Sequence, residues 1–420
     1  MPKRGRTTDD GRRTLGKPKA IGLGYACLAS IMMLVANPIL PPAHASTSNH
    51  LRPTTSHQPL ADPRSGAKGT ASSPQPLAAS HQPLTASPIP LLAYYYIWFD
   101  VNSWDRAKTD FPLLGRYSSD DLRVMQQHIR WAKAAGITGF VVSWKNTEKL
   151  DRRLAQLVEL ADAEDFKLSL IYQGLNFERE PLPLEQIMAD LDYFIQTYAS
   201  HPAFQLFEKP LVIWSGTWKY STEAVARLTQ GRRDSLLILA SEKNIEGYER
   251  LAELVDGDAY YWSSVNPETF PNYAGKLIGM SEAVHAHAGL WIAPAAPGFD
   301  ARLVGGTTVV ERQEGETLRR EIATALQSAP DAIGLISWNE FSENSQIEPS
   351  ENYGQRYLEV LMDVQHRKLP RLTPVLDFDS SEPGDTVMGM GLDRNRTLAM
   401  SLLIALVLSS LIVIGQRRLK

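Results

Sequence analysis

Eight short apolar runs that alternate with amphipathic stretches predict an α/β protein, a (β/α)8 or TIM barrel, in the central part of this 420-residue chain. The runs recur over roughly 280 residues, which is enough for one large core. No glycine-rich dinucleotide loop follows the first run. An open doubly wound sheet is the alternative, since it accommodates the same alternation, but it does not require eight units.

Each predicted strand is a run rich in branched or aromatic residues. In chain order the predicted strands are residues 91–98, 137–144, 167–172, 210–214, 235–240, 257–262, 289–294 and 332–338. Helices are expected between most of them. One covers SSDDLRVMQQHIRWAKAAG, with Ser119 or Asp120 as N-cap and Gly136 as its stop, and SENYGQRYLEVLMDV closes the series.

The N-terminal part of the chain has a different character. Residues 1–45 have the layout of a secretory signal, with a basic stretch, an apolar core at 21–36 and an Ala-x-Ala pattern that predicts cleavage after Ala45. An uncleaved anchor helix is the alternative. Residues 46–88 are rich in Ser, Thr and Pro, and this composition predicts a disordered linker.

The C-terminal part predicts attachment to a membrane. Residues 372–396 are expected to form a polar tether, 397–415 a transmembrane helix and 416–420 a short basic cytoplasmic tail. The barrel itself is assigned to residues 89–371. We therefore expect a protein of the cell membrane that crosses it once after signal cleavage, with the barrel outside the cytoplasm.

Composition excludes several classes of function. Cys27 is the only cysteine, so a chain that has lost its signal has no disulfide framework. The formal net charge is −4 and the central region has no long basic block, so nucleic acid is not an expected partner. No histidine pair has metal-ligand spacing at a strand end, and no G-x-S-x-G elbow is present. We expect a monomer without metal or cofactor.

The ends of the predicted strands carry many aromatic residues. Function in this class of barrel sits at the carboxyl ends of the strands. Tryptophan or tyrosine occurs at six of the eight ends, where flat rings can stack on sugars and polar tips can bond to hydroxyls. The alternative is that some rings only plug the top of the barrel. Taken together, the set favours a polar and aromatic ligand cleft.

Two glutamates follow the last predicted strand in the segment SWNEFSENSQIEPS. Glu340 stands where the strand should end, and Glu343 lies three residues further. A helical turn would bring their Cβ atoms to about 5–6 Å. Carboxyl groups roughly 5 Å apart suit glycosidic cleavage with retention, whereas wider pairs suit inversion. The alternative is that Glu343 or Glu348 only caps the following helix.

This segment resembles the carboxylate motif of glycoside hydrolase family 99, the endo-α-mannosidase family, whose usual form is close to W/F-N-E-W-H-E-G-T-Q-I-E. AYYYIWFD, GRYSSDDLRVMQQHIRWAKAAGITGFVVSW, HPAF and APGF are similar to further pieces of that family in the same order, over roughly residues 91–357. The resemblance implies a (β/α)8 barrel, no metal, and cleavage of an α-linked glycan with retention.

The resemblance also implies roles for particular residues. Glu340 would be a base acting on the sugar's own 2-hydroxyl to give a 1,2-anhydro sugar, and Glu343 would be the acid. FSEN replaces the family's Trp-His-Glu-Gly, and a glutamine stands where a glutamate is common. The substrate is therefore expected to be α-mannan-like or an α-glucan. The candidate substrate-binding residues are Tyr95, Tyr96, Trp144, Gln173, Tyr261, Trp262, Arg302, Asn339 and Glu348.

Two hypotheses follow from these observations. The first is a membrane-tethered, endo-acting, retaining glycoside hydrolase with a glycan as its partner. The second is a carbohydrate-binding or polysaccharide-assembly protein whose catalysis is weakened. Both carboxylates are present, which favours the enzyme, while their altered neighbours keep the second hypothesis open.

Overall fold

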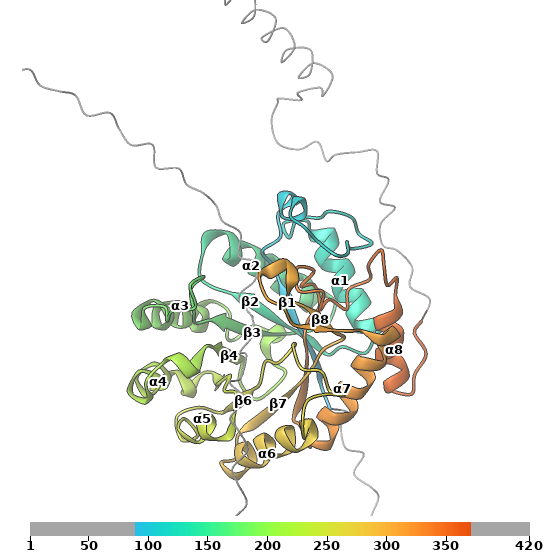
Figure 1. Cartoon of the computed structure of the whole chain (residues 1–420). Coiled ribbons are helices and arrows are strands. Elements are labelled where there is room, and N and C mark those ends of the chain that lie inside the picture. The colour runs from blue at the N-terminus through green and yellow to red at the C-terminus, as the bar shows by residue number, and fades with distance from the viewer. Residues whose placement is uncertain (1–88, 371–420) are drawn as a thin grey trace, which may run out of the picture. The chain divides into compact units, whose positions relative to one another are not determined.

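The computed structural model describes residues 89–370, in which parallel strands are surrounded by helices (Figure 1). The predicted signal or anchor, linker, tether, transmembrane segment and cytoplasmic tail lie outside the described residues. Within residues 89–370, none of the helices has the length and apolar character needed to cross a membrane.

Eight parallel strands form the barrel. The strand order is β5-β4-β3-β2-β1-β10-β7-β6. A further parallel bridge joins Ala240 to Asp258, so the two outer strands meet and the sheet closes on itself. The strands are β1 Leu91–Tyr96, β2 Gly139–Trp144, β3 Lys167–Gln173, β4 Leu211–Ser215, β5 Leu237–Leu239, β6 Gly257–Ala259, β7 Leu290–Ala295 and β10 Ala332–Leu335. All eight lie within or beside the predicted runs, which confirms the predicted barrel.

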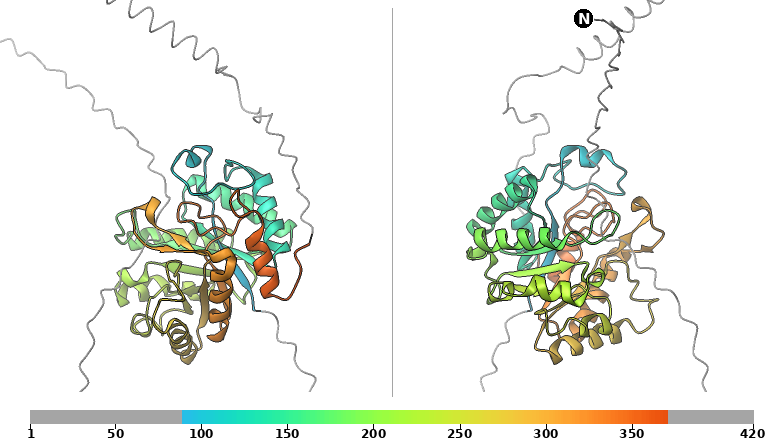
Figure 2. Two further views of the ribbon diagram at one scale, coloured as in Figure 1. Left: turned by 45° about the vertical axis from the view of Figure 1, so that its right-hand side comes forward. Right: turned by 90° about the vertical axis from the view of Figure 1, so that its left-hand side faces the viewer.

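In the described part of the chain, eight α-helices enclose the strands (Figure 2). They are α1 Leu122–Ala134, α2 Glu148–Ala163, α3 Leu184–Thr197, α4 Thr222–Thr229, α5 Ile245–Glu249, α6 Tyr273–Ala286, α7 Glu316–Gln327 and α8 Arg356–Val364. The predicted N-cap of α1 is wrong by one or two positions: the carboxylate of Asp121 accepts the Arg123 N–H. Gly136 ends this segment as predicted, with φ of 77°.

Alternation along the strands separates two cores. One buried cluster takes a residue from every barrel strand, including Leu92 and Tyr94 of β1, and therefore fills the interior of the barrel. The other contains Leu91, Ala93 and Tyr95 and packs between strands and helices. Because side chains alternate along a strand, this pattern decides which strand-end residues face the mouth of the barrel.

A short hairpin that the sequence did not predict follows β7. It pairs β8 Phe299–Asp300 with β9 Val309–Val310 in antiparallel fashion. The N–H of Asp300 donates to the main-chain carbonyl of Glu343 at 2.7 Å. The hairpin thus fixes one side of the loop that carries the glutamates.

Candidate active site

The loop after β10 holds Glu340 and Glu343 in a turn. Residues 341–344 form this turn, and Asn344 has φ of 48°, so the segment is not a helix. The N–H of Glu340 donates to the Ser337 hydroxyl at 2.8 Å. The N–H of Ser342 donates to Glu340 Oε1 at 2.9 Å. The backbone of the turn therefore fixes the Glu340 carboxyl directly.

Both glutamates are buried, with 3% of Glu340 and 1% of Glu343 exposed. Burial raises the pKa of Glu340 to about 7, against the opposing effects of the Ser342 N–H and the positive charge of Lys108. Burial and the negative charge of Glu340 raise the pKa of Glu343 well above its usual range. Two nearby buried carboxylates repel each other, so the charge of Glu340 disfavours the ionised form of Glu343.

The Glu343 carboxyl is incompletely bonded. Its Oε2 atom is buried and has no hydrogen-bond partner within residues 89–370. A buried polar atom without a partner is costly in a native protein, and a bound water or ligand is one way to satisfy it. The arrangement leaves this oxygen available to a ligand that supplies the missing hydrogen bond.

Two tyrosines lie beside the glutamates. The hydroxyls of Tyr96 and Tyr261 are 2.8 Å apart. Burial, and then the negative charges of the neighbouring groups, raise the pKa of both phenols well above the usual range, so both stay neutral. The side-chain amide of Asn339 bonds to the main-chain N–H and carbonyl of Tyr96, each at 2.9 Å. Asn339 is therefore a positioning residue that holds the end of β1 against the loop that carries the two glutamates.

A cavity of about 970 Å³ lies at the carboxyl ends of β3 to β6. Three of the predicted binding residues line it: Gln173, Tyr261 and Trp262. Gln173 follows the interior alternation of β3, and its amide lies 3.4 Å from the Ser143 hydroxyl. The two glutamates are not among the lining residues. Tyr261 connects the two regions, because it lines the cavity and also bonds to Tyr96.

Tyr95 and Glu348 belong to a different network, between β1 and α1. The Tyr95 hydroxyl is 3.0 Å from Nδ1 of His128, whose Nε2 is 2.9 Å from Glu348 Oε1. The Tyr117 hydroxyl donates to Glu348 Oε2 at 2.9 Å. Tyr95 faces outward because it lies one position from the interior residues of β1. The structure thus places both predicted binding residues away from the cavity, in a fully bonded cluster.

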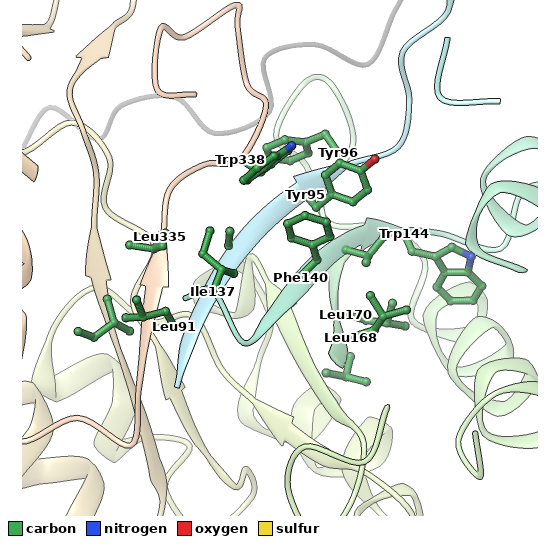
Figure 3. Close-up of a cluster of buried hydrophobic side chains, with 14 of the residues drawn as sticks. Leu91, Tyr95, Tyr96, Ile137, Phe140, Trp144, Leu168, Leu170, Leu335 and Trp338 are labelled. Atoms are coloured by element: carbon green, nitrogen blue, oxygen red, sulfur yellow. The ribbon is translucent and has the colours of Figure 1, made fainter. Parts of the chain in front are cut away.

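Trp144 and Arg302 also lie apart from the cavity. Trp144 has the outward alternation of Phe140 in β2 (Figure 3). Its ring packs against Tyr193 and Phe194 of α3. The guanidinium of Arg302 pairs with Asp300 at 2.6 Å, and its side chain is 66% exposed. The structure brings neither residue together with the glutamates or the cavity, and their contact with a substrate stays a prediction.

Several residues that the sequence analysis did not select contribute to this region. Arg179, Lys243 and Lys276 line the cavity together with Trp218. Lys243 lies within the strand-end segment ASEKN, so its position after a strand was an available signal. Among residues 89–370, no group of three or more histidine, cysteine, aspartate or glutamate side chains could hold a metal ion.

A closed parallel barrel that carries a buried carboxyl pair beside tyrosines at its strand ends has the build of a glycoside hydrolase. The chain belongs to glycosyl hydrolase family 99, whose family model matches residues 98–367. This finding confirms the resemblance of the glutamate segment.

Named relatives and a solved structure agree with this membership. The human glycoprotein endo-alpha-1,2-mannosidase-like protein is 24% identical over 285 residues, covering 61% of each chain. The rat glycoprotein endo-alpha-1,2-mannosidase is 22% identical over 269 residues, covering 58% of this chain and 57% of the relative. The chain thus spans about three fifths of the length of these relatives.

The GH99 endo-alpha-mannosidase from Bacteroides thetaiotaomicron superposes with a TM-score of 0.58 at 20% identity. The match covers 66% of this chain and 97% of that one. At this level of identity the likeness shows a shared fold.

Proposed function

We propose that this protein is an endo-acting glycoside hydrolase that cleaves an α-linked glycan with retention, with Glu340 and Glu343 as its catalytic pair. The observation that carries the proposal is the pair itself: two adjacent buried carboxyl groups in unequal environments. Family membership supports the class of reaction, and the names of the relatives support the α-linkage.

The unequal environments assign the two roles. Glu340 accepts a main-chain N–H and has the positive charge of Lys108 nearby, both of which favour its ionised form. Glu343 faces the charge of Glu340 and has an unbonded oxygen, both of which favour its protonated form. Glu340 is then the base and Glu343 the acid, since a catalytic acid must hold its proton at the working pH.

The proposed reaction has two displacements at the anomeric carbon. In the first, Glu340 takes the proton of the 2-hydroxyl, O2 attacks C1, and the departing oxygen receives the proton of Glu343. A 1,2-anhydro sugar results. In the second, water attacks C1 and gives a proton to Glu343, while O2 recovers its proton from Glu340. Two inversions at one carbon give net retention.

The proposed substrate is an α-mannan-like glycan or an α-glucan. Trp262 and Tyr261 at the cavity supply aromatic faces for sugar rings, and Gln173 supplies an amide for hydroxyls. The cavity is large enough for a glycan fragment, since ligand sites commonly measure about 300–1,000 Å³.

The test is turnover of α-mannan and α-glucan oligosaccharides by the full-length chain, with the product anomer followed by NMR. We expect an α product at first release. A 2-deoxy or 2-O-methyl substrate should resist cleavage, because no 2-hydroxyl remains to attack C1. If such a substrate is cleaved at the normal rate, the anhydro-sugar route is wrong, and a direct nucleophile or an attacking water replaces it.

One observation favours a second candidate function. Both glutamates are almost fully buried, and neither lines the cavity. A carbohydrate-binding or polysaccharide-assembly protein with weakened catalysis would show such a site. Tight binding of oligosaccharides across the panel, without hydrolysis, would establish this alternative and overturn the enzyme proposal.

We also propose that the apolar segment 398–415 holds the barrel outside the cytoplasm at the cell membrane. The charge-free run and the basic residues after it support this proposal. Truncation before Arg394 should release a folded barrel from the membrane fraction. If the truncated chain stays in that fraction after the signal is removed, the tether is assigned wrongly.

A further inference from the structure

The cavity beside the glutamates is lined by cations. Arg179 comes from the loop after β3, Lys243 from the loop after β5, and Lys276 from the first turn of α6. Among the described residues that line the cavity, none is an aspartate or a glutamate. The whole chain has a formal net charge of −4, so this concentration of positive charge is a local property of the cavity.

Two of these cations rest on aromatic faces. Lys243 Nζ lies 3.9 Å from the centre of the Trp218 ring. Lys276 Nζ lies 5.1 Å from the centre of the Tyr260 ring and 5.0 Å from that of Trp262. Such contacts hold an ammonium group in place without neutralising it. The cavity thus presents fixed positive charges beside flat surfaces that suit sugar rings.

Within residues 89–370, neither Lys243 nor Lys276 forms an ion pair with a carboxylate. Glu242 precedes Lys243 in the chain, but its carboxylate is bonded to Arg250 at 3.1 Å. Both lysines are half-buried. Partial burial of an ammonium group without a counterion is unfavourable, so the cavity is better suited to a ligand that brings negative charge.

The catalytic glutamates do not account for these lysines. The cations that oppose the raised pKa values of the pair are Lys108 for Glu340 and Arg179 for Glu343. The charge of Arg179 therefore lowers the pKa of Glu343 and also adds to the positive charge of the cavity. Burial, and then the positive charges of Arg179 and Lys219, lower the pKa of Lys243 to about 8 against the opposing charge of Glu242. Burial also lowers the pKa of Lys276.

We propose that the natural substrate is an anionic glycan whose carboxylate, sulfate or phosphate substituent binds among Arg179, Lys243 and Lys276. The proposal rests on the proposed function, because Tyr261 joins the cavity to the glutamate pair. The aromatic side chains receive the sugar rings, and the cations select the charged substituent through charge-assisted hydrogen bonds.

The test compares matched probes on the full-length chain. Neutral α-linked mannose and glucose oligosaccharides are measured beside the same oligosaccharides that carry one uronate, one sulfate or one phosphate. Binding is followed by calorimetry and turnover by product analysis. We expect the best anionic form to bind about tenfold or more tightly than its neutral counterpart. The three anionic arms identify the substituent, and added salt should reduce the preference.

Variants locate the preference. Lys243→Gln and Lys276→Gln should each reduce the ratio of anionic to neutral affinity by about tenfold. Lys133→Gln is the matched control, since it removes an exposed lysine at the end of α1, and its ratio should equal that of the unaltered chain. Thermal unfolding of each variant confirms that the barrel is folded.

The outcomes separate this inference from the proposed function. Cleavage of neutral and anionic glycans with equal efficiency would overturn the inference and leave the hydrolase in place. Anionic preference in binding without any hydrolysis would support the inference and overturn the hydrolase. If the lysine variants shift the pH profile of neutral cleavage but leave the charge preference unchanged, the cations serve the glutamates and the inference is wrong.

Discussion

Two glutamates from the same loop have opposite surroundings. Both oxygens of Glu348 are bonded, one to His128 and one to Tyr117. Glu343, five positions earlier in the chain, is equally buried, yet its Oε2 has no partner among the described residues. The bonded carboxylate holds the loop against α1 through His128, whereas the unbonded one is left for a ligand.

The difference teaches how one short segment can serve stability and chemistry together. A buried carboxyl with all its partners has little capacity left for a substrate. A buried carboxyl without partners is unfavourable for folding, and the folded barrel tolerates it. Glu343 and Glu348 therefore differ in their hydrogen-bond partners, although they lie five positions apart in the same segment.

The largest expected effect concerns the proposed catalytic pair. Glu340→Gln should abolish measurable turnover of every substrate, because no base remains for the 2-hydroxyl. Glu343→Gln should lower kcat by about 10²–10⁴-fold on natural glycans, which need a proton on the leaving oxygen. With a substrate whose leaving group needs no protonation, the loss of kcat in Glu343→Gln should be smaller. Turnover of both substrate types is the measurement.

Glu351→Gln is the control for both substitutions, because Glu351 is exposed and lies just beyond the same loop. Its turnover should match that of the unaltered chain. Full activity of Glu340→Gln would remove Glu340 from the proposed mechanism.

The next effect tests the structural glutamate. Glu348→Ala should lower the free energy of unfolding by about 3–5 kcal/mol, since it leaves His128 and Tyr117 without their buried acceptor. Urea unfolding monitored by tryptophan fluorescence measures this change. A loss below 1 kcal/mol, within the range of an ordinary surface change, would show that the network is not essential.

A smaller effect of opposite sign is expected for the unbonded glutamate. A carboxyl whose pKa is raised by folding stabilises the protein most below its unfolded pKa, and this contribution is lost as pH rises through the folded pKa. Glu340 and Glu343 have pKa values raised from 4.5, to about 7 for Glu340. Glu343→Gln should therefore increase the free energy of unfolding relative to the unaltered chain. This increase should be larger at pH 8 than at pH 5 by about 1–3 kcal/mol.

Thermal or urea unfolding of both proteins at the two pH values measures this difference. Equal stability gains at pH 5 and pH 8 would contradict the assigned protonation of Glu343.

The smallest effect concerns the tyrosine between cavity and glutamates. Tyr261→Phe removes the hydroxyl that is bonded to Tyr96. We expect transition-state stabilisation to fall by about 0.5–1.5 kcal/mol, which lowers kcat/KM by up to roughly tenfold. Tyr193→Phe on α3 is the matched control, since its hydroxyl bonds to Asp151 instead. If both variants lose activity equally, the Tyr96–Tyr261 contact has no special role at the site.

The barrel could be predicted from sequence because each of its strands is a local apolar run. The position of Glu340 and Glu343 followed from their place after the last run. The aromatic set was predicted less well, since proximity to a strand end does not say which way a side chain points. Because side chains alternate along a strand, Tyr96 has the same inward orientation as Leu92 and Tyr94, whereas Tyr95 points outward. This rule would have distinguished the two tyrosines.

The cations of the cavity were missed for another reason. Arg179 and Lys276 lie in segments that approach each other only when the barrel closes, so no local pattern joins them. Loop conformation also decides where they point: Arg179 has φ of 64° in a turn bonded to Asn176. Such placement depends on tertiary structure, which periodicity in a sequence does not describe.

The bond between Asn339 and the end of β1 has a consequence for how the protein folds. The two residues it joins are 243 positions apart in the chain. Contacts of such long range form late and slow folding, because a long loop must close first. We therefore expect the loop that carries Glu340 and Glu343 to take its final shape only after nearly the whole domain has been synthesised, so that a shorter, partly made chain lacks the proposed catalytic site.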